Sequence, residues 1–211
     1  LRGNDAVNQL ITTALAMQPA GLNRGTSGNV SVRSGDGFYI TPTGLPYASL
    51  SADDIPLMAL DGTHQGSRKP SSEWRFHRDL YASRPAVGAV LHAHSPFAVS
   101  LACLRLDIPP FHYMIARFGG STIRCADYAI FGSELLSTAA LAAMENRHAC
   151  LLANHGLLVA GRDLAEALAL AIDAKDQTAQ SHIRRVQVYA AGLAKALGMP
   201  EQEIQGVKTA A

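Results

Sequence analysis

Two short β-rich stretches joined by a tight turn constrain the fold of this chain more than any other feature. Residues 29–33 and 38–41 are rich in residues that favour strands, and Ser34-Gly35-Asp36-Gly37 between them has the composition of a reverse turn. A connection this short joins antiparallel strands, whereas parallel strands need a long crossover. The chain is therefore not built only from repeated strand–helix–strand units, and its mixture of strands and helices predicts a layered α/β domain.

The remaining elements follow from apolar periodicity and from the residues that begin or end helices. Pro19 and Gly21 end a helix over residues 5–17, and Ser71 caps another over residues 72–83. At 211 residues the chain is long enough to bury a substantial core, and we expect one domain, residues 1–211. Further strands are predicted at 55–60, 87–94, 149–152 and 157–160, and further helices at 97–103, at 134–146 and from the capping box of Asp163 and Glu166 to about residue 190.

Charge and hydropathy limit the partners that this chain is expected to have. The formal net charge is +1 and no run of like charges occurs, so neither nucleic acid nor an anionic membrane is expected as a partner. No apolar run reaches the roughly 20 residues that span a bilayer, and the first residues lack the layout of a signal peptide. Charged residues make up only 17% of the chain, which favours an oligomer that buries part of the surface between subunits.

The cysteines indicate a reducing compartment. Cys103, Cys125 and Cys150 are odd in number, widely spaced and free of a CxxC pair. This pattern argues against a disulfide framework and against a thiolate zinc site. We expect all three to be small buried hydrophobic residues in a cytoplasmic protein.

The strand expected over residues 87–94 ends in His92-Ala93-His94. Side chains alternate between the faces of a strand, so these two imidazoles point the same way and lie side by side. Each disfavours protonation of the other, and a shared divalent cation resolves that conflict; two hydrogen-bonded histidines that line a cleft are the alternative. His155, at the tip between two apolar strands, offers a third nitrogen, and three histidines with one open position are typical of catalytic zinc.

Glu73 is the candidate general acid and base. It lies in the first turn of the helix that Ser71 caps, where the helix dipole favours a carboxylate, so a purely structural N-terminal charge is the alternative. For a proton-transfer role we expect partial burial to raise the pKa of its carboxyl, an effect that a neighbouring cation opposes.

The other histidines have weaker contexts for metal binding. Glu73 and His77 would share one helix face, but no second helical histidine accompanies them, as an HExxH site requires. His64 lies in a polar loop, His148 follows a helix end, and His182 falls on the outer part of the last helix. We expect none of these to be ligands.

Three turns are suited to binding an anion through backbone N–H groups and hydroxyls. They are Gly25-Thr26-Ser27-Gly28-Asn29, Thr41-Pro42-Thr43-Gly44, and Ser71-Ser72 at a helix N-terminus. Each alone is also compatible with an ordinary turn or cap. The chain has no GxxxxGK[ST] loop and no GxGxxG after a strand, which disfavours nucleotide chemistry. Beside a metal site, the three turns predict a small phosphorylated substrate.

Several motifs resemble, in sequence and in order, the class II aldolase/adducin family. The resemblance covers residues 21 to about 180 and implies an α/β domain with a central, mainly antiparallel sheet between helices, assembled as a homotetramer. The matching segments are GLNRGTSGNVSVR (21–33), ITPTGLPY (40–47), KPSSEWRFH (69–77), AVLHAHS (89–95), PPFHYMIARFGG (109–120) and ANHGLLVAG (153–161).

The resemblance also implies roles for individual residues. His92, His94 and His155 would bind Zn²⁺, with Mn²⁺, Co²⁺ or Fe²⁺ as alternatives. Glu73 would be the acid/base and, in the ligand-free enzyme, a further metal ligand. Tyr113 would exchange a proton with the oxygen on the aldehyde side. The implied phosphate site consists of Thr26, Gly28, Asn29, Thr43, Gly44, Ser71 and Ser72.

The implied activity is that of a carbon–carbon lyase, a zinc-dependent aldolase. It would cleave a ketose 1-phosphate, either L-fuculose 1-phosphate or a deoxy- or methylthio-pentulose 1-phosphate, reversibly to dihydroxyacetone phosphate and an aldehyde. Two departures bear on the aldehyde: residues 205–211 contain no aromatic side chain, and Arg117 and Phe118 differ from the family pattern. A pentulose-phosphate 4-epimerase and a methylthioribulose-1-phosphate dehydratase are the alternatives. The three histidines and Glu73 argue against a non-catalytic adducin-like module.

Overall fold

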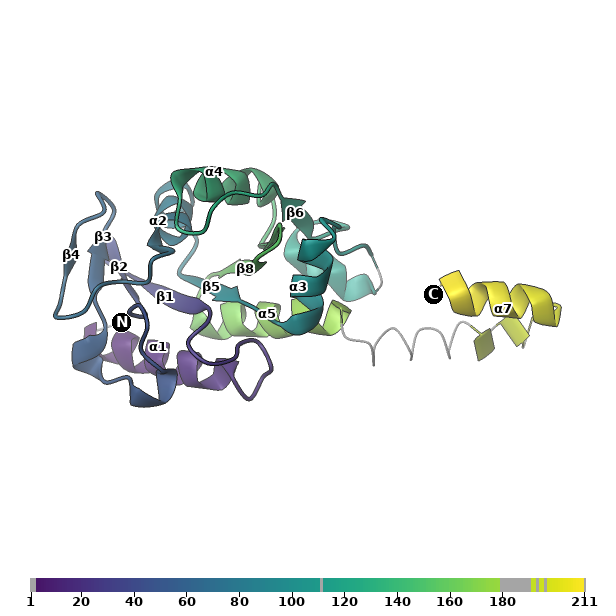
Figure 1. Cartoon of the computed structure of the whole chain (residues 1–211), viewed down its shortest axis with the longest axis horizontal. Helices are drawn as coiled ribbons and strands as arrows, with labels where there is room; N and C mark the ends of the chain where they lie inside the picture. The colour runs from purple at the N-terminus through teal and green to yellow at the C-terminus, as the bar shows by residue number, and fades with distance from the viewer. Residues whose placement is uncertain (1–2, 111, 179–190, 193, 196, 211) are drawn as a thin grey trace.

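The computed structural model of the protein describes residues 3–110, 112–178, 191–192, 194–195 and 197–210. Within them, an eight-stranded sheet has the strand order β4-β3-β2-β1-β5-β8-β7-β6 (Figure 1). Neighbouring strands are antiparallel except β6 and β7, which run parallel. The strands are β1 (Asn29–Ser34), β2 (Gly37–Ile40), β3 (Leu57–Ala59), β4 (His64–Gln65), β5 (Ala89–Ala93), β6 (Arg124–Ala126), β7 (Ala149–Leu152) and β8 (Gly156–Gly161).

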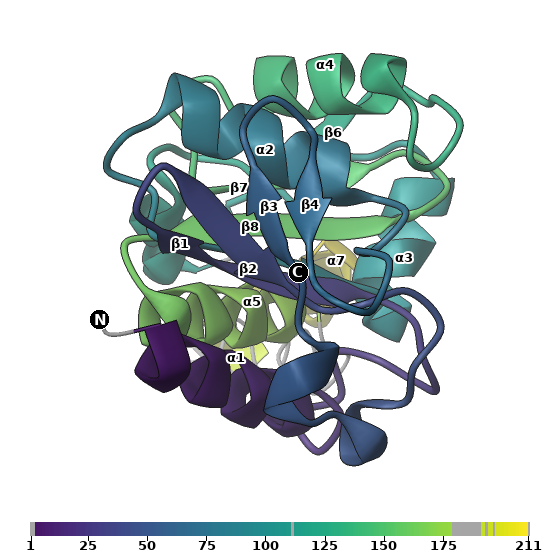
Figure 2. The same ribbon diagram turned by 90° about the vertical axis from the view of Figure 1, so that its left-hand side faces the viewer.

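Helices cover both faces of the sheet, which confirms the predicted layered α/β class with a central, mainly antiparallel sheet (Figure 2). One face forms an apolar core with α1 (Gly3–Met17), α3 (Pro96–Cys103) and α5 (Leu164–Thr178). The other face forms a second core with α2 (Trp74–Ser83) and α4 (Glu134–Ala143). The last helix, α7 (Glu201–Ala210), lies apart from these layers in Figure 1.

The central strand β5 is buried along its whole length, which accounts for its nearly unbroken apolar sequence. Leu91 points into the core with α1, α3 and α5, and Val90 points into the core with α2 and α4. Alternation places His92 on the same face as Val90, and the ring of His92 contacts the ring of Phe76 on α2 edge-on. The sheet therefore presents His92 toward the α2 layer.

Element boundaries differ from the predictions for local reasons. The helix predicted over residues 72–83 begins at Trp74, because Ser71 forms a turn in which its Oγ accepts the backbone N–H of Glu73, and Glu73 becomes the N-cap residue. The helix predicted over 134–146 ends at Ala143, and Asn146 then takes a left-handed conformation with a φ of 56°. Strands β4 and β6 were not predicted, since two or three residues give no periodic signal.

Some expectations are corrected or fall outside the described residues. The predicted helix to about residue 190 is described to Thr178, and its remainder, including His182, lies outside the described residues. Cys150 is buried as expected, but Cys125 is only partly buried and Cys103 is exposed, because Cys103 ends α3 beside the core-facing Ala102. Among the described helices, none is long and apolar enough to cross a membrane.

The packing of α1 gives a test of this architecture. Leu10 is 0% exposed against the sheet, whereas Leu15 on the same helix is 44% exposed. Leu10→Ala is expected to lower the free energy of unfolding by about 2–5 kcal/mol, because it leaves a cavity in the core. The matched control Leu15→Ala should cost less than about 1 kcal/mol. Urea unfolding followed by circular dichroism measures both, and equal losses would contradict the packing of α1.

Candidate metal centre and the adjoining cavity

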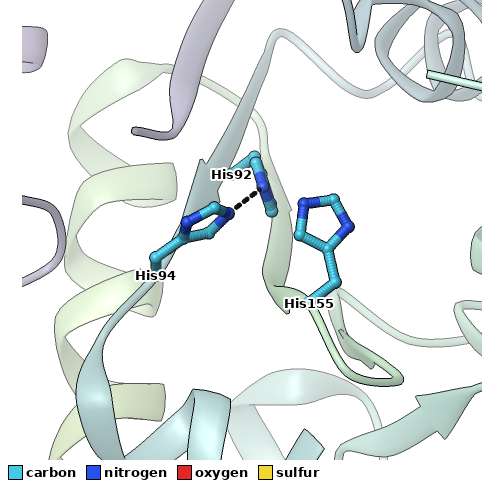
Figure 3. Close-up of side chains that lie close together, drawn as sticks. All are labelled: His92, His94 and His155. Atoms are coloured by element: carbon cyan, nitrogen blue, oxygen red, sulfur yellow. Dashed lines mark hydrogen bonds between the residues drawn. The ribbon is translucent and has the colours of Figure 1, made fainter. Parts of the chain in front are cut away.

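His92, His94 and His155 converge beside the centre of the sheet (Figure 3). Their candidate ligand nitrogens all lie within 4.8 Å of one another. His92 belongs to β5, His94 follows that strand directly, and His155 occupies the turn between β7 and β8. The structure thus brings together the three histidines that the sequence singled out, including the distant His155.

The turn that carries His155 can approach β5 because Gly156 has no side chain. A Cβ atom at Gly156 would lie 2.6 Å from the carbonyl oxygen of Ala93 and 2.8 Å from the ring of His94. Asn154 takes a left-handed conformation with a φ of 57°, which asparagine tolerates better than most residues. The Asn-His-Gly sequence is therefore what allows the third imidazole to reach the other two.

Hydrogen bonding determines which nitrogen of His92 faces the site. Nδ1 donates to the carbonyl oxygen of Leu157 at 2.9 Å, and Nε2 lies 2.8 Å from Nε2 of His94. Burial lowers the pKa of His92 to about 3, so that the neutral ring keeps a lone pair on Nε2. A neutral imidazole oriented by a backbone acceptor is the usual form of a protein metal ligand. The donor set therefore fits a divalent cation such as Zn²⁺.

The carboxylate of Glu73 faces these histidines from the start of α2. Its Oε1 lies 3.0 Å from Nε2 of His155, and its Oε2 lies 3.4 Å from Nε2 of His92. Glu73 is only 8% exposed. Burial raises the pKa of this carboxyl, but the neighbouring histidines outweigh burial and lower the pKa to about 2. The net direction is therefore downward, opposite to the expectation from burial alone, and Glu73 is ionised at neutral pH.

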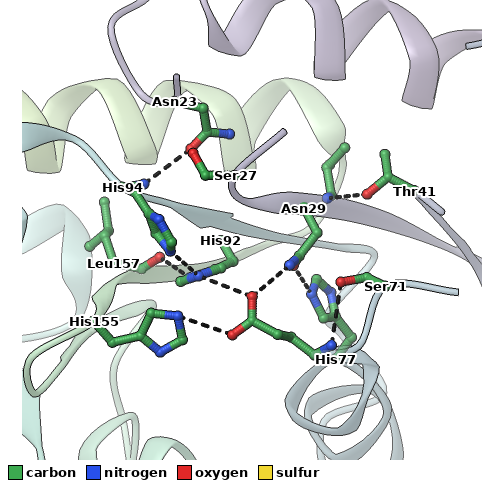
Figure 4. A network of polar contacts seen from close by, with 12 residues as sticks. Asn23, Ser27, Asn29, Thr41, Ser71, His77, His92, His94, His155 and Leu157 are labelled. Atoms are coloured by element: carbon green, nitrogen blue, oxygen red, sulfur yellow. Dashed lines mark hydrogen bonds and ion pairs between the residues drawn. The ribbon is translucent and has the colours of Figure 1, made fainter. Parts of the chain in front are cut away.

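A chain of buried side chains extends from Glu73 away from the histidine cluster (Figure 4). Nδ2 of Asn29 donates to Oε2 of Glu73 at 3.0 Å, and Oδ1 of Asn29 lies 2.6 Å from Nε2 of His77. Nδ1 of His77 lies 2.7 Å from Oγ of Ser31, which lies 2.8 Å from the hydroxyl of Tyr81. His77 thus takes part in a hydrogen-bond network rather than in a helical metal site with Glu73.

A cavity of about 370 Å³ adjoins the histidines and Glu73. His94, His155 and Glu73 line it together with two aromatic residues that sequence reasoning missed, Tyr128 and Phe131. These aromatic residues lie in an irregular loop that gives no periodic or polar signal. All seven residues expected to bind phosphate also line the cavity: Thr26, Gly28, Asn29, Thr43, Gly44, Ser71 and Ser72.

Backbone contacts bring the three anion-ready turns to this one cavity. The N–H of Ser71 donates to the carbonyl of Thr41 at 3.0 Å, and the N–H of Thr43 donates to the carbonyl of Lys69 at 3.1 Å. Gly28 has a φ of 77°, and a Cβ there would lie 2.6 Å from the carbonyl oxygen of His92. The glycine therefore lets the first turn pack directly against the end of β5.

The loop that carries Tyr128 and Phe131 is attached to the start of α2. Nη1 of Arg75 donates to the carbonyl oxygen of Gly132 at 2.7 Å. A Cβ at Gly132 would lie 2.7 Å from the carbonyl oxygen of Ser72, so this glycine also permits a close approach. The two aromatic side chains therefore lie beside the Ser71-Ser72 turn while remaining 57% and 65% exposed.

Several other candidates lie away from the cavity. Tyr113 begins the 3₁₀-helix Tyr113–Phe118, is 77% exposed and is not among the residues that line the cavity. Arg117 and Phe118, which were expected near the aldehyde, are also elsewhere: Arg117 pairs with Asp173 on α5, and Phe118 is buried in the core with α1, α3 and α5. His64 and His148 are exposed and do not line this cavity.

Comparison with known proteins identifies the family. A sequence profile of the Class II Aldolase and Adducin N-terminal domain matches residues 8–180. The chain belongs to this family. The resemblance drawn from the six sequence motifs is therefore confirmed.

Similar proteins within the class II aldolase and adducin family are named as aldolases. The chain is 52% identical to the 5-methylthioribulose-1-phosphate/5-deoxyribulose-1-phosphate aldolase of Rhodospirillum rubrum, over 85% of this chain and 80% of that protein. It is 47% identical to the L-fuculose phosphate aldolase of Escherichia coli strain K12, over 80% of this chain and 78% of that protein. A solved L-fuculose 1-phosphate aldolase matches with a TM-score of 0.80 at 34% identity, covering 97% of this chain and 95% of that chain.

Lowering the pH is expected to destabilise the protein through His77. A histidine in the unfolded chain has a pKa of about 6.5, whereas burial lowers the pKa of His77 to about 3. Between these values the unfolded state binds the extra proton, so stability falls as the pH drops, by up to about 1.4 kcal/mol per pH unit. His77→Gln removes the titrating group. Urea unfolding between about pH 6.5 and 5 should show a shallower pH dependence for this variant; parallel dependences would contradict a neutral, buried His77.

Proposed function

We propose that this chain is a metal-dependent class II aldolase that cleaves a ketose 1-phosphate reversibly to dihydroxyacetone phosphate and an aldehyde. The observation that carries the proposal is a single cavity in which imidazoles and a carboxylate face three anion-ready turns. The imidazoles and the carboxylate suit charge stabilisation and proton transfer at carbon. The three turns suit a phosphate that is bound away from the breaking bond. The aldolase names of relatives at 52% and 47% identity support the same activity.

We assign the metal to His92, His94 and His155, with Zn²⁺ as the expected ion and Mn²⁺, Co²⁺ or Fe²⁺ as alternatives. When bound, the ion would act as a Lewis acid that stabilises the negative charge on the C2 oxygen as the C3–C4 bond breaks. Burial keeps the ring of His92 neutral, and the Leu157 carbonyl orients it for this role. Glu73 lies close enough to them to be a further ligand before substrate binds.

The substrate phosphate is assigned to the three turns that line the cavity. Their backbone N–H groups and hydroxyls would donate to the phosphate, and the N-terminus of α2 adds a favourable dipole. No lysine or arginine is among the described residues that line the cavity, so these neutral donors would hold the phosphate. Binding at this distance from the C3–C4 bond would keep the substrate in register with Glu73.

Glu73 is the proposed proton-transfer group at carbon. Cleavage requires C3 to gain a proton, and the reverse reaction requires a base to remove that proton. The carboxylate of Glu73 is ionised at neutral pH and so has the free oxygen that accepts this proton in the direction of synthesis, although its lowered pKa makes it a weak base. In the direction of cleavage, Glu73 must first receive the proton that it delivers.

Tyr113 is proposed to exchange the other proton, with the C4 oxygen of the aldehyde half. Its side chain is exposed and outside the cavity of its own chain, so a neighbouring copy would have to supply it. We therefore propose a homotetramer, the assembly that the family resemblance implies, with sites shared between copies. The free thiols of Cys103 and Cys125 are consistent with a cytoplasmic location.

The direct test is a cleavage assay on purified, zinc-loaded protein, with and without a chelator. Candidate substrates are the 1-phosphates of fuculose, rhamnulose, ribulose, 5-deoxyribulose and 5-methylthioribulose, and the detected product is dihydroxyacetone phosphate. We expect release from at least one substrate, abolished by the chelator and restored by added metal. If fully metallated protein released no triose phosphate from any of them, the aldolase proposal would fail. Epimerase and dehydratase assays would then be the next to run.

Glu73→Gln separates proton transfer from metal binding. The variant is expected to keep its metal while kcat falls by about 10²–10⁴-fold, because the amide cannot carry the proton. His155→Ala serves as the contrasting control and should lose both metal and activity, since it removes a ligand. Metal content by mass spectrometry and steady-state kinetics measure the two effects. Normal turnover by Glu73→Gln would contradict its assignment.

A further inference from the structure

His77 is a buried titratable group that the proposed reaction does not use. It lies on the inner side of α2, is completely buried, and is not among the residues that line the cavity. Its two ring nitrogens nevertheless contact Asn29 and Ser31 on β1, and Asn29 in turn contacts Glu73. Through Asn29, His77 is therefore connected to the Glu73 carboxylate.

The direction of each hydrogen bond follows from the acceptor at its end. An ionised carboxylate only accepts, so Nδ2 of Asn29 donates to Glu73, and the amide oxygen faces His77. That oxygen also only accepts, so Nε2 of His77 carries the proton and Nδ1 of the neutral ring is an acceptor. Nδ1 then accepts from the hydroxyl of Ser31, which accepts from Tyr81. Every bond in the chain points toward the carboxylate.

The Asn29 amide becomes more important when a cation is bound. Nε2 of His92 carries a lone pair and does not donate to Glu73, and an imidazole nitrogen of His155 that holds a cation has no proton to donate across its 3.0 Å contact with Oε1 of Glu73. Among the described side chains in contact with the carboxylate, Asn29 would then remain as the donor. Without a proton from His77, the amide could turn over and present its oxygen, which a carboxylate repels.

We propose that His77 is a positioning residue that holds the Asn29 amide, and through it the Glu73 carboxylate, in the orientation needed for proton transfer. This inference rests on the proposed function, in which Glu73 moves the proton at carbon. His77 touches neither the substrate nor the cation in this arrangement. Its contribution is therefore expected mainly in kcat and little in KM.

Two substitutions separate this role from a merely structural one. In His77→Gln, the amide nitrogen reaches the place of Nε2 and can still donate to Asn29. In His77→Asn, the shorter side chain reaches only the place of Nδ1, so it keeps Ser31 as a partner but leaves Oδ1 of Asn29 without a donor. Both variants lose the packing of the ring, so each is the control for the other.

Kinetics, bound metal and the urea unfolding midpoint would be measured for both variants. We expect His77→Asn to lower kcat on the order of 10- to 100-fold while KM for the ketose phosphate stays within about threefold. We expect His77→Gln to keep kcat within about threefold of the wild type, and both variants to keep their metal. Equal losses of kcat, in step with equal losses of stability, would overturn the positioning role.

A double-mutant cycle tests whether His77 acts through Asn29. Asn29→Ala should itself lower kcat, and adding His77→Asn to that background should lower kcat by less than about threefold more. Losses that multiply independently would refute the route through the amide.

The tautomer of His77 gives a readout that needs no reaction. In protein labelled with ¹⁵N-histidine, with His77 assigned by comparison with His77→Gln, NMR should show a neutral ring whose proton is on Nε2. A proton on Nδ1 would overturn the hydrogen-bond chain even in an active enzyme. A wild-type protein that cleaves no ketose phosphate would instead refute the proposed function. The tautomer would still show whether the hydrogen-bond chain from His77 to Glu73 is present.

Discussion

The pairing of β5 with β1 on one side and β8 on the other is the constraint on which the rest of the site depends. The register places His92 opposite Asn29 on β1 and opposite Leu158 on β8. The candidate ligand His92 therefore lies beside Asn29, whose amide contacts Glu73. It also lies beside β8, whose Leu157 carbonyl orients the imidazole of His92. A slip of one residue would turn His92 into the opposite apolar core, and the burial of β5 on both faces disfavours such a slip.

Within this frame, the protonation states of the polar groups support one another. Burial keeps His77 and His92 neutral, and each ring directs its single N–H to a fixed oxygen, on Asn29 or on Leu157. The same surroundings keep Glu73 charged despite its burial. Lone pairs and negative charge therefore have defined directions before a ligand arrives, which reduces the reorganisation that binding and proton transfer require.

Features with a strong local signal could be predicted from sequence, whereas features set by packing could not. The hairpin, the His92 and His94 pair and the family membership all depend on short motifs, and the motifs also named the seven turn residues that now line one cavity. The network around His77 could not be predicted, because it requires α2 to lie against β1 at one specific register. The exposed position of Tyr113, outside the cavity of its own chain, likewise depends on the tertiary path of the chain rather than on any motif.

The polar groups and the aromatic groups of the cavity lie on different parts of the structure. The candidate ligands, the carboxylate and the three anion-ready turns lie in the sheet, at its ends and at the start of α2. Tyr128 and Phe131 lie in an irregular loop whose Gly132 carbonyl accepts a hydrogen bond from Arg75. Tyr128 and Phe131 belong to neither apolar core, whereas Ala129 in the same loop packs against the core with α2 and α4. Because Tyr128 and Phe131 lie outside both cores, the shape of the cavity beside them can change without moving the histidines, Glu73 or the three turns, so this loop is where a change in the accepted substrate would be made.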